Sequence, residues 1–231
     1  MALIVDIETV GEDWQKIDET TKSHLLEKAA KRLANDADVE EVVSSELGLS
    51  PLTSQIVALG VLDSDTSKGA VYFQAPNQNI PDSVKDGLKY HTGVEKEILT
   101  KFWEIAEKYT EFVTYNGRTF DFPFIMIRSA IDGLRAGKDL TRARYLYQQS
   151  PQAVHVDLYD QLTFYGAAKV GSLHMVCRAF GIETPKDGEI DGSKVGEYFL
   201  AKKYQEIAEY NGRDLTATAE LYRRWKKLLS F

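Results

Sequence analysis

The sequence predicts an α/β protein with a mixed five-stranded sheet that is covered by helices on both faces. Three observations predict this fold class. Residues 2–9 form an apolar, β-branched run typical of a strand buried on both faces. Residues 55–74 contain two strand-like runs joined by a turn-forming segment at 63–69, which indicates a hairpin. Farther along, short strand-like runs alternate with helical patterns, as expected for a helix-covered sheet.

The first half of the chain is expected to supply three strands and an insertion. Residues 11–49 carry acids and lysines around an apolar stripe, which predicts one or two amphipathic surface helices inserted between core elements. The hairpin strands are expected at 55–62 and 70–74. Residues 75–92 contain two prolines and are expected to form a loop and a short helix.

The remainder is predicted to be mostly helical, with strands at 111–115 and 153–157. The expected helices are, in chain order, 95–109, a segment that starts near residue 121, 158–165, 172–180, 193–203 and 204–229. No repeat, low-complexity linker or break in composition divides the chain. Residues 1–231 are therefore expected to form a single domain with a helical insertion at about 11–49.

Composition limits the class of protein. The chain is 43% hydrophobic and 27% charged, which is ordinary for a soluble globular protein, and it has no apolar run of membrane-spanning length. Residues 1–15 lack the pattern of a signal peptide, so a cytoplasmic location without a membrane partner is expected. The net charge of −7 disfavours a sequence-independent nucleic-acid-binding module more than it disfavours a metal nuclease. The single cysteine, Cys177, lies in a helical apolar pattern and is expected to be a buried structural thiol.

Two carboxylates end the first predicted strand. Asp6 and Glu8 are two residues apart, so their side chains leave the same face of a strand. Two anions at the edge of a core repel each other and are costly to desolvate unless a cation lies between them. Carboxylate oxygens suit Mg²⁺ or Mn²⁺. The alternative is a strand end with solvated acids in a turn.

Two further segments carry candidate residues. Asp121 follows the Gly turn after the strand at 111–115, at a position that also suits a helix N-cap. Tyr210 and Asp214 are four residues apart inside a helical pattern and therefore share one face. The alternative for this pair is a packed tyrosine and a surface acid. Gly212 between them could let backbone or substrate approach closely.

In this order, Asp6-Ile-Glu8, Asn116 to Asp121 and Tyr210 to Asp214 resemble the three exonuclease motifs of the DEDD superfamily. These proteins are 3′-to-5′ exonucleases with an RNase H-like fold. The strongest resemblance is to the proofreading exonuclease domain of family-B DNA polymerases and to stand-alone predicted exonucleases related to it.

The resemblance covers nearly the whole chain, from residue 2 to about 219, although the 11–49 insertion and the loops match loosely. Tyr210, four residues before the last aspartate, corresponds to the tyrosine branch of the superfamily. The family commonly has Cys after this Tyr, where the present chain has Asn211.

The resemblance implies a role for each motif residue. Asp6, Glu8, Asp121 and Asp214 would hold two divalent metal ions, with Asp6 as the bridge between them. Tyr210 would orient the attacking water or help to deprotonate it. Two further residues stand where relatives contact the terminal nucleotides: Asn116, through a hydrogen bond, and Phe120, through stacking. A core role for Phe120 is an open alternative.

The expected function is that of a metal-dependent 3′-5′ exonuclease with two Mg²⁺ or Mn²⁺ ions. Its substrate would be single-stranded nucleic acid, with DNA favoured over RNA, its products nucleoside 5′-monophosphates, and its process DNA repair. The alternatives are a catalytically silent RNase H-like module that binds nucleic acid or a protein partner, and an RNA-directed nuclease of the same fold. A basic run follows the second motif and consists of Arg135, Lys138, Arg142 and Arg144. These residues could track a phosphate backbone. The alternative is a solvated loop, which is the usual structure of a run of charges.

Overall fold

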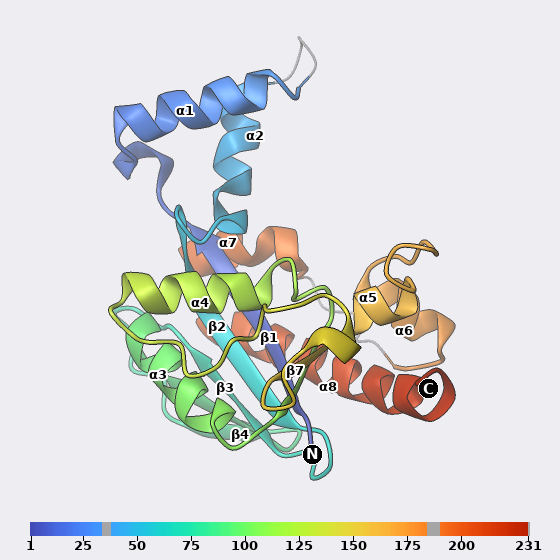
Figure 1. Ribbon diagram of the computed structural model, residues 1–231. Coiled ribbons are helices and arrows are strands. Elements are labelled where there is room, and N and C mark those ends of the chain that lie inside the picture. Colours follow the sequence, from blue (N-terminus) through green and yellow to red (C-terminus); the bar gives the residue numbers. More distant parts are fainter. Residues whose placement is uncertain (34–37, 184–189, 231) are drawn as a thin grey trace.

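The computed structural model describes residues 1–33, 38–183 and 190–230. Its centre is a seven-stranded sheet with the strand order β4-β5-β3-β2-β1-β6-β7 (Figure 1). The strands are β1 (Leu3–Gly11), β2 (Ser54–Asp63), β3 (Gly69–Phe73), β4 (Ser83–Lys85), β5 (Leu88–Thr92), β6 (Glu111–Thr114) and β7 (Val154–Asp157).

The sheet is mixed, as expected. β1 lies in its interior, antiparallel to β2 and parallel to β6, and β7 continues parallel to β6. β2 and β3 form the predicted antiparallel hairpin. Beyond it, β5 pairs parallel with β3, and β4 pairs antiparallel with β5.

The expected number of five strands was wrong, because residues 75–92 contain β4 and β5 where a loop and a short helix were expected. β4 has only three residues, all of them exposed, so it lacks the apolar alternation that marks a strand. Asp86 and Gly87 join the two strands with φ angles of 52° and 81°. An Asp-Gly pair of this kind strongly predicts a hairpin. The expectation of a loop and a short helix in this segment did not take this pair into account.

The helices agree with the predicted pattern. They are α1 (Glu19–Ala30), α2 (Val39–Glu46), α3 (Glu95–Ala106), α4 (Asp121–Ile131), α5 (Leu158–Leu162), α6 (Leu173–Ala179), α7 (Val195–Leu200) and α8 (Tyr204–Leu228), with short 3₁₀ helices at Trp14–Lys16, Leu47–Leu49, Leu146–Gln148 and Gly192–Lys194. The predicted insertion forms α1 and α2, which extend away from the sheet (Figure 1). Part of that insertion, residues 34–37, lies outside the described residues. None of the described helices has the length and apolarity needed to cross a membrane.

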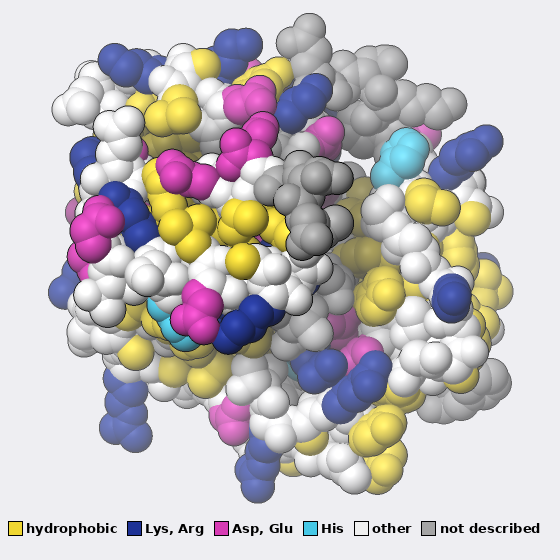
Figure 2. All heavy atoms as spheres, turned by 90° about the horizontal axis from the view of Figure 1, so that it is seen from above, with side chains coloured by type: hydrophobic (Ala, Val, Ile, Leu, Met, Phe, Trp, Pro, Cys, Tyr) yellow, Lys and Arg dark blue, Asp and Glu magenta, His cyan; other side chains and the backbone are white. Residues whose placement is uncertain are grey.

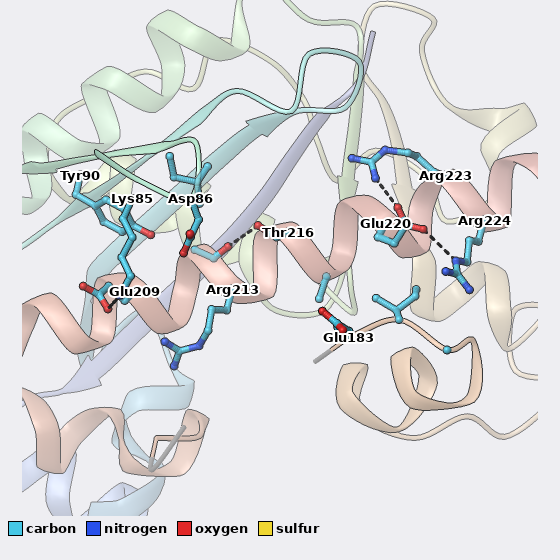
Figure 3. Close-up of a pocket in the computed structure, with 15 residues that line it drawn as sticks. Lys85, Asp86, Tyr90, Glu183, Glu209, Arg213, Thr216, Glu220, Arg223 and Arg224 are labelled. Atoms are coloured by element: carbon cyan, nitrogen blue, oxygen red, sulfur yellow. Dashed lines mark hydrogen bonds and ion pairs between the residues drawn. The ribbon is translucent and has the colours of Figure 1, made fainter. Parts of the chain in front are cut away.

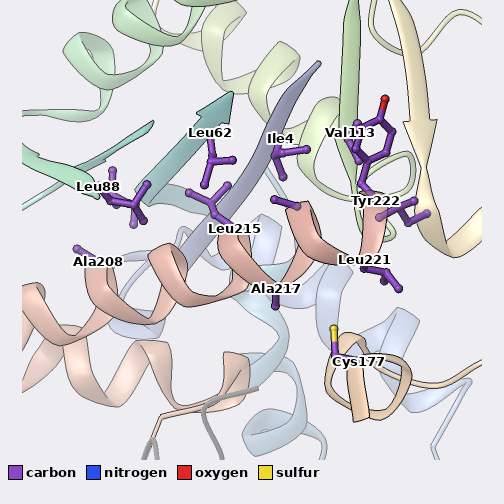
Figure 4. Packing of buried hydrophobic residues seen from close by; sticks show 14 of the residues in the cluster. Ile4, Leu62, Leu88, Val113, Cys177, Ala208, Leu215, Ala217, Leu221 and Tyr222 are labelled. Atoms are coloured by element: carbon purple, nitrogen blue, oxygen red, sulfur yellow. The ribbon is translucent and has the colours of Figure 1, made fainter. Parts of the chain in front are cut away.

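Two hydrophobic cores lie on opposite faces of the sheet. On one face, Phe102 of α3 and Phe122 of α4 pack with Leu3 of β1. On the other, α8 packs across the sheet, and Figure 4 shows Leu215 beside Ile4 of β1. The alternation of side chains along β1 thus sends neighbouring residues into different cores. Cys177 is fully buried in the core beneath α8, as the sequence predicted.

Two glycines allow α8 to approach the sheet closely. A Cβ atom on Gly60 of β2 would lie 2.2 Å from Asn211 Oδ1 and 2.3 Å from Leu215 Cδ1. A Cβ atom on Gly212 of α8 itself would lie 2.5 Å from the hydroxyl of Tyr90. Gly212 therefore permits close packing of the helix backbone against β5.

Replacing Gly60 by alanine should destabilise the protein. The added methyl group has no space between β2 and α8, and overpacking of this kind costs about 1–3 kcal/mol. Urea unfolding of Gly60→Ala should show a lower midpoint than the wild type. Gly196→Ala is the matched control, since no atom lies within 4 Å of its added Cβ. Equal midpoints for Gly60→Ala and Gly196→Ala would contradict the close approach of α8.

Candidate active site

Asp6 and Glu8 lie on the face of β1 that α8 covers. Because side chains alternate along a strand, they share the side of Ile4 and not that of Ile7. Glu8 is only 8% exposed, and Asp6 is half-buried. The register of β1 against β2 shifts between Glu8 and Thr9, so this part of the strand contains a bulge or irregularity. The strand thus places both acids under the helix, as the two-residue spacing predicted.

Asp214 approaches the same point from α8. One carboxylate oxygen from each of Asp6, Glu8 and Asp214 lies within 4.8 Å of the others. Residues separated by more than two hundred positions therefore form one carboxylate cluster. The donor set consists of hard oxygen atoms, which fits a divalent cation such as Mg²⁺ or Mn²⁺.

Asp121 borders this cluster from a different helix, α4. It is the first residue of α4, and the N-cap position belongs to Phe120, which makes no side-chain cap. The interpretation of Asp121 as an N-cap is therefore wrong. Its Oδ1 instead accepts a hydrogen bond of 3.1 Å from the backbone N–H of Ile7, the residue between Asp6 and Glu8. The sheet thus fixes Asp121 next to the other acids.

The four carboxyl groups disfavour one another's charge. Burial raises the pKa of Asp6, and Glu8, Asp121 and Asp214 raise it further. The pKa of Glu8 is raised by burial and then by Asp214 and Asp121. Burial raises the pKa of Asp121 to about 7 and that of Asp214 to about 6. Such a group of acids is stable in its ionised form only with positive charge nearby.

Tyr210 stands beside the cluster on the same face of α8. Burial raises its pKa far above the ordinary value, and the charges of Asp214, Glu8 and Asp6 raise it further. A hydrogen bond with Asp214 favours the protonated form as well, so the hydroxyl stays protonated at neutral pH. The guanidinium of Arg213 lies 5.8 Å from the centre of the Tyr210 ring.

Asn211 is a residue of this site that the sequence did not reveal. Its Nδ2 donates a hydrogen bond of 2.7 Å to Asp6 Oδ2, and the side chain is fully buried. Its Oδ1 has no hydrogen-bond partner among the residues that the structure describes. In the sequence, Asn211 stood out only as a departure from the usual Cys. Asn211 stands three residues before Asp214, and residues at this spacing share one face of a helix. This spacing was the sequence signal that could have placed Asn211 in the site.

The loop between β6 and α4 carries Asn116. This residue has a φ of 66°, and the side chain of Asp157 accepts hydrogen bonds from the backbone N–H groups of Asn116 (2.8 Å) and Arg118 (2.9 Å). Asn116 is exposed, with its Oδ1 accepting from the hydroxyl of Thr119. Asp157, which is not among the predicted site residues, thus holds the loop in place.

Phe120 and His155 pack against the core. The ring of Phe120 is half-buried and lies 5.0 Å from that of Phe124, so the alternative of a core role for Phe120 has structural support.

His155 is buried, and its Nε2 lies 2.8 Å from the hydroxyl oxygen of Thr114. Burial lowers the pKa of His155 to about 3. His155 is therefore neutral and structural.

A pocket of about 560 Å³ lies along a neighbouring face of α8 (Figure 3). Its lining contains none of the four acids, although it includes Arg213, which precedes Asp214. Most of its charged side chains pair with one another, as Lys85 does with Glu209 at 2.5 Å. The Nε of Arg213 has no hydrogen-bond partner. The pocket and the carboxylate cluster are therefore distinct features that share one helix.

Comparison with known proteins shows that this chain is similar to parts of DNA polymerases. The chain is 29% identical over 195 residues to a DNA polymerase of Methanocaldococcus jannaschii, which covers 78% of this chain and 11% of the polymerase. It is 26% identical over 221 residues to DNA polymerase 1 of Saccharolobus solfataricus, which covers 90% of this chain and 24% of the polymerase. The chain thus spans a quarter or less of the length of these relatives.

The fold is also found in a solved polymerase. The structure of the family B DNA polymerase from the hyperthermophilic archaeon Pyrobaculum calidifontis matches with a TM-score of 0.61 at 20% identity, over 97% of this chain and 24% of that one. This match confirms the expected RNase H-like fold class. Residues 67–230 match the family model described as "Predicted 3'-5' exonuclease related to the exonuclease domain of PolB". The predicted class of enzyme, a 3′-5′ exonuclease, is thereby confirmed, and the chain belongs to this family of exonucleases related to the exonuclease domain of PolB.

Proposed function

We propose that this chain is a metal-dependent 3′-5′ exonuclease that acts on single-stranded nucleic acid and releases nucleoside 5′-monophosphates. One observation carries the proposal: oxygens of Asp6, Glu8 and Asp214 lie within 4.8 Å of one another, and Asp121 borders them. The single domain expected from the sequence would supply every group that the reaction needs.

The metal ligands we propose are the four acids, Asp6, Glu8, Asp121 and Asp214. Burial raises the pKa values of all four acids, and neighbouring carboxylates of the cluster raise those of Asp6 and Glu8 further, so divalent cations would remove an electrostatic penalty. Two Mg²⁺ or Mn²⁺ ions held by these acids would supply an activated water and would stabilise the charge on the leaving 3′ oxygen. Asp6 is the proposed bridge between the two ions, as the resemblance to the DEDD exonucleases implies.

The remaining polar groups would position the reactants. Tyr210 keeps its proton and would orient the attacking water as a hydrogen-bond donor. Asn211 donates a hydrogen bond to Oδ2 of Asp6. The other oxygen of Asp6 would then be the one that faces the metal ions. Asn116 is exposed at the end of β6 and would contact the terminal nucleotide. Phe120 is the proposed stacking contact, with the part of its ring that the core leaves exposed.

DNA is the favoured substrate, and DNA repair the favoured process. The curated relatives are named DNA polymerases, which supports DNA over RNA. An RNA-directed activity is the second candidate, since recognition of the 2′-hydroxyl depends on contacts that these motifs do not specify. A catalytically silent module would be expected to lose at least one acid, whereas this chain keeps the complete set.

Substitution of Asp6 should abolish the activity. Single-stranded DNA and RNA with a 5′ label, incubated with Mg²⁺ or Mn²⁺, should give a ladder that shortens from the 3′ end. Asp6→Asn should lower the rate at least about 100-fold, because it removes the charge of the proposed bridge. Asp13→Asn, a change in an exposed acid outside the cluster, is the matched control. Internal cleavage products, or a ladder that persists in Asp6→Asn, would contradict the proposal.

Tyr210→Phe should lower the catalytic rate and leave metal binding intact. Loss of a hydrogen bond that positions the water should reduce kcat by about 100-fold. The affinity for Mn²⁺, measured by calorimetry, should stay the same because the hydroxyl is not a proposed ligand. A variant with unchanged kcat would exclude Tyr210 from the chemistry.

Without metal, the stability of the protein should fall as the pH rises. Asp121 and Asp214 have folded-state pKa values of about 7 and about 6, above their ordinary values. The native state therefore binds more protons than the unfolded state between about pH 4 and 7, and stability is lost as the pH increases through this range. In EDTA at pH 8, Asp121→Asn should be more stable than the wild type by about 1–3 kcal/mol.

Thermal unfolding in EDTA and in Mg²⁺ across this pH range measures the effect. Mg²⁺ should flatten the pH dependence of the wild type, since it compensates the carboxylate charge. Stability that increases with pH in EDTA would contradict the strained carboxylate cluster.

A further inference from the structure

Three aromatic rings in contact with one another, of which Tyr165 is half-buried, and the exposed Phe164 next to Tyr165 in the chain are here called the aromatic patch: Tyr145, Tyr147, Phe164 and Tyr165. Tyr147 is 83% exposed and Phe164 is 55% exposed. The ring of Tyr145 stacks on that of Tyr147 at 5.8 Å and contacts that of Tyr165 at 4.7 Å. Large aromatic side chains that lie together in solvent generally mark a binding surface.

The backbone holds two of these rings in place at an energetic cost. Phe164 and Tyr165 have φ angles of 49° and 57°, in the left-handed region that bulky residues rarely occupy. The N–H of Tyr165 donates to the carbonyl of Asp160 at 2.7 Å, and its hydroxyl accepts from Gln161 at 2.9 Å. A turn without any other task would place Gly or Asn at such positions. The strain therefore points to a task for the exposed rings.

One carboxylate connects the patch to the candidate active site. Asp160 accepts a hydrogen bond of 2.7 Å from Arg118 and one of 2.6 Å from Arg144. Arg118 belongs to the loop that leads from Asn116 to Asp121. The guanidinium of Arg144 lies 5.9 Å from the centre of the Tyr165 ring. The patch is thus anchored to the loop that carries part of the proposed site.

Cationic residues flank the patch in the sequence, although the chain as a whole carries a net charge of −7: Arg142 stands three residues before Tyr145, and Lys169 four residues after Tyr165. Arg142 and Lys169 are exposed, and neither makes a hydrogen bond or an ion pair with the described part of the chain. Two other members of the basic run have structural partners: Arg144 bonds to Asp160, and Lys138 to the carbonyl of Tyr109. Figure 2 shows Lys and Arg side chains and hydrophobic side chains along the rim of a hollowed region in which acidic side chains are visible.

We propose that the aromatic patch is a platform on which bases of single-stranded nucleic acid stack, upstream of the 3′ end that enters the carboxylate cluster. Arg142 and Lys169 would contact the phosphates of the same strand. Flat rings with adjacent cations match the alternation of bases and phosphates, and stacking is tolerant of sequence. The inference rests on the proposed exonuclease function, which needs a strand of any sequence to reach the site.

The test measures binding separately from cleavage. In the full chain with Asp6→Asn, fluorescence anisotropy gives the affinity for 5′-labelled oligothymidylates of 12 and of 3 nucleotides. The double change Tyr147→Ala and Phe164→Ala should weaken binding of the 12-mer by about 10-fold or more, in keeping with the contribution of stacked bases. Binding of the 3-mer should not change, because it fills only the region next to the acids.

Matched variants separate stacking from other effects. Tyr147→Phe keeps the ring and should bind the 12-mer like the parent, and Leu52→Ala removes an exposed apolar side chain elsewhere, 71% exposed. Arg142→Gln with Lys169→Gln should reduce the salt dependence of 12-mer binding. Tyr147→Ala alone serves as a second variant in case the strained turn fails to fold when Phe164 is replaced.

The outcomes distinguish this inference from the proposed function. A wild-type chain that degrades 3′ ends, with 12-mer affinity unaffected by loss of the rings, would overturn the platform and leave the exonuclease standing. A wild type without nuclease activity, whose 12-mer binding still depends on the rings, would support the platform and overturn the exonuclease. Equal losses for the 12-mer and the 3-mer would overturn the platform, since they would show a general disturbance of the site.

Discussion

Mutual repulsion among buried carboxylates is the constraint on which this structure depends. Asp6, Glu8 and Asp214 bring their oxygens within 4.8 Å on a covered face of the sheet, where ionisation is costly. The large apolar core between α8 and strands β1 and β2 offsets this cost. The absence of a side chain at Gly60 permits α8 to approach the sheet closely and leaves room for Asn211. The core thus stabilises an arrangement that the acids alone would disperse.

The groups around the acids hold them from several directions. Asn211 donates to Asp6 from the helix, and Ile7 donates to Asp121 from the strand. A second layer of acids, Asp157 and Asp160, organises the adjoining loop by binding its backbone N–H groups and Arg118. Elements far apart in the sequence therefore converge on one point, and the exposed aromatic side chains are joined to it through Asp160. Such support is what a site with demanding geometry requires.

Physical patterns explain what the sequence could and could not predict. Buried strands such as β1 and the helix around Tyr210 follow from apolar runs and periodicity, and the spacing of Asp6 and Glu8 placed them on one face. β4 was missed because an exposed three-residue edge strand has no apolar pattern. Two features depend on tertiary contacts, which no local pattern specifies. They are the hydrogen bond from Asn211 to Asp6 and the hydrogen bond that Asp157 accepts from the backbone of Asn116.

The number of metal ions bound by the carboxylate cluster tests the central claim most directly. A crystal structure of the protein with Mn²⁺, with the ions located by their anomalous scattering, gives this number and the ligands together. We predict two ions ~3.5–4 Å apart, with Asp6 bound to both and with Glu8, Asp121 and Asp214 completing the ligands. A cluster that binds no ion at saturating Mn²⁺, or ions held by other residues, would contradict it.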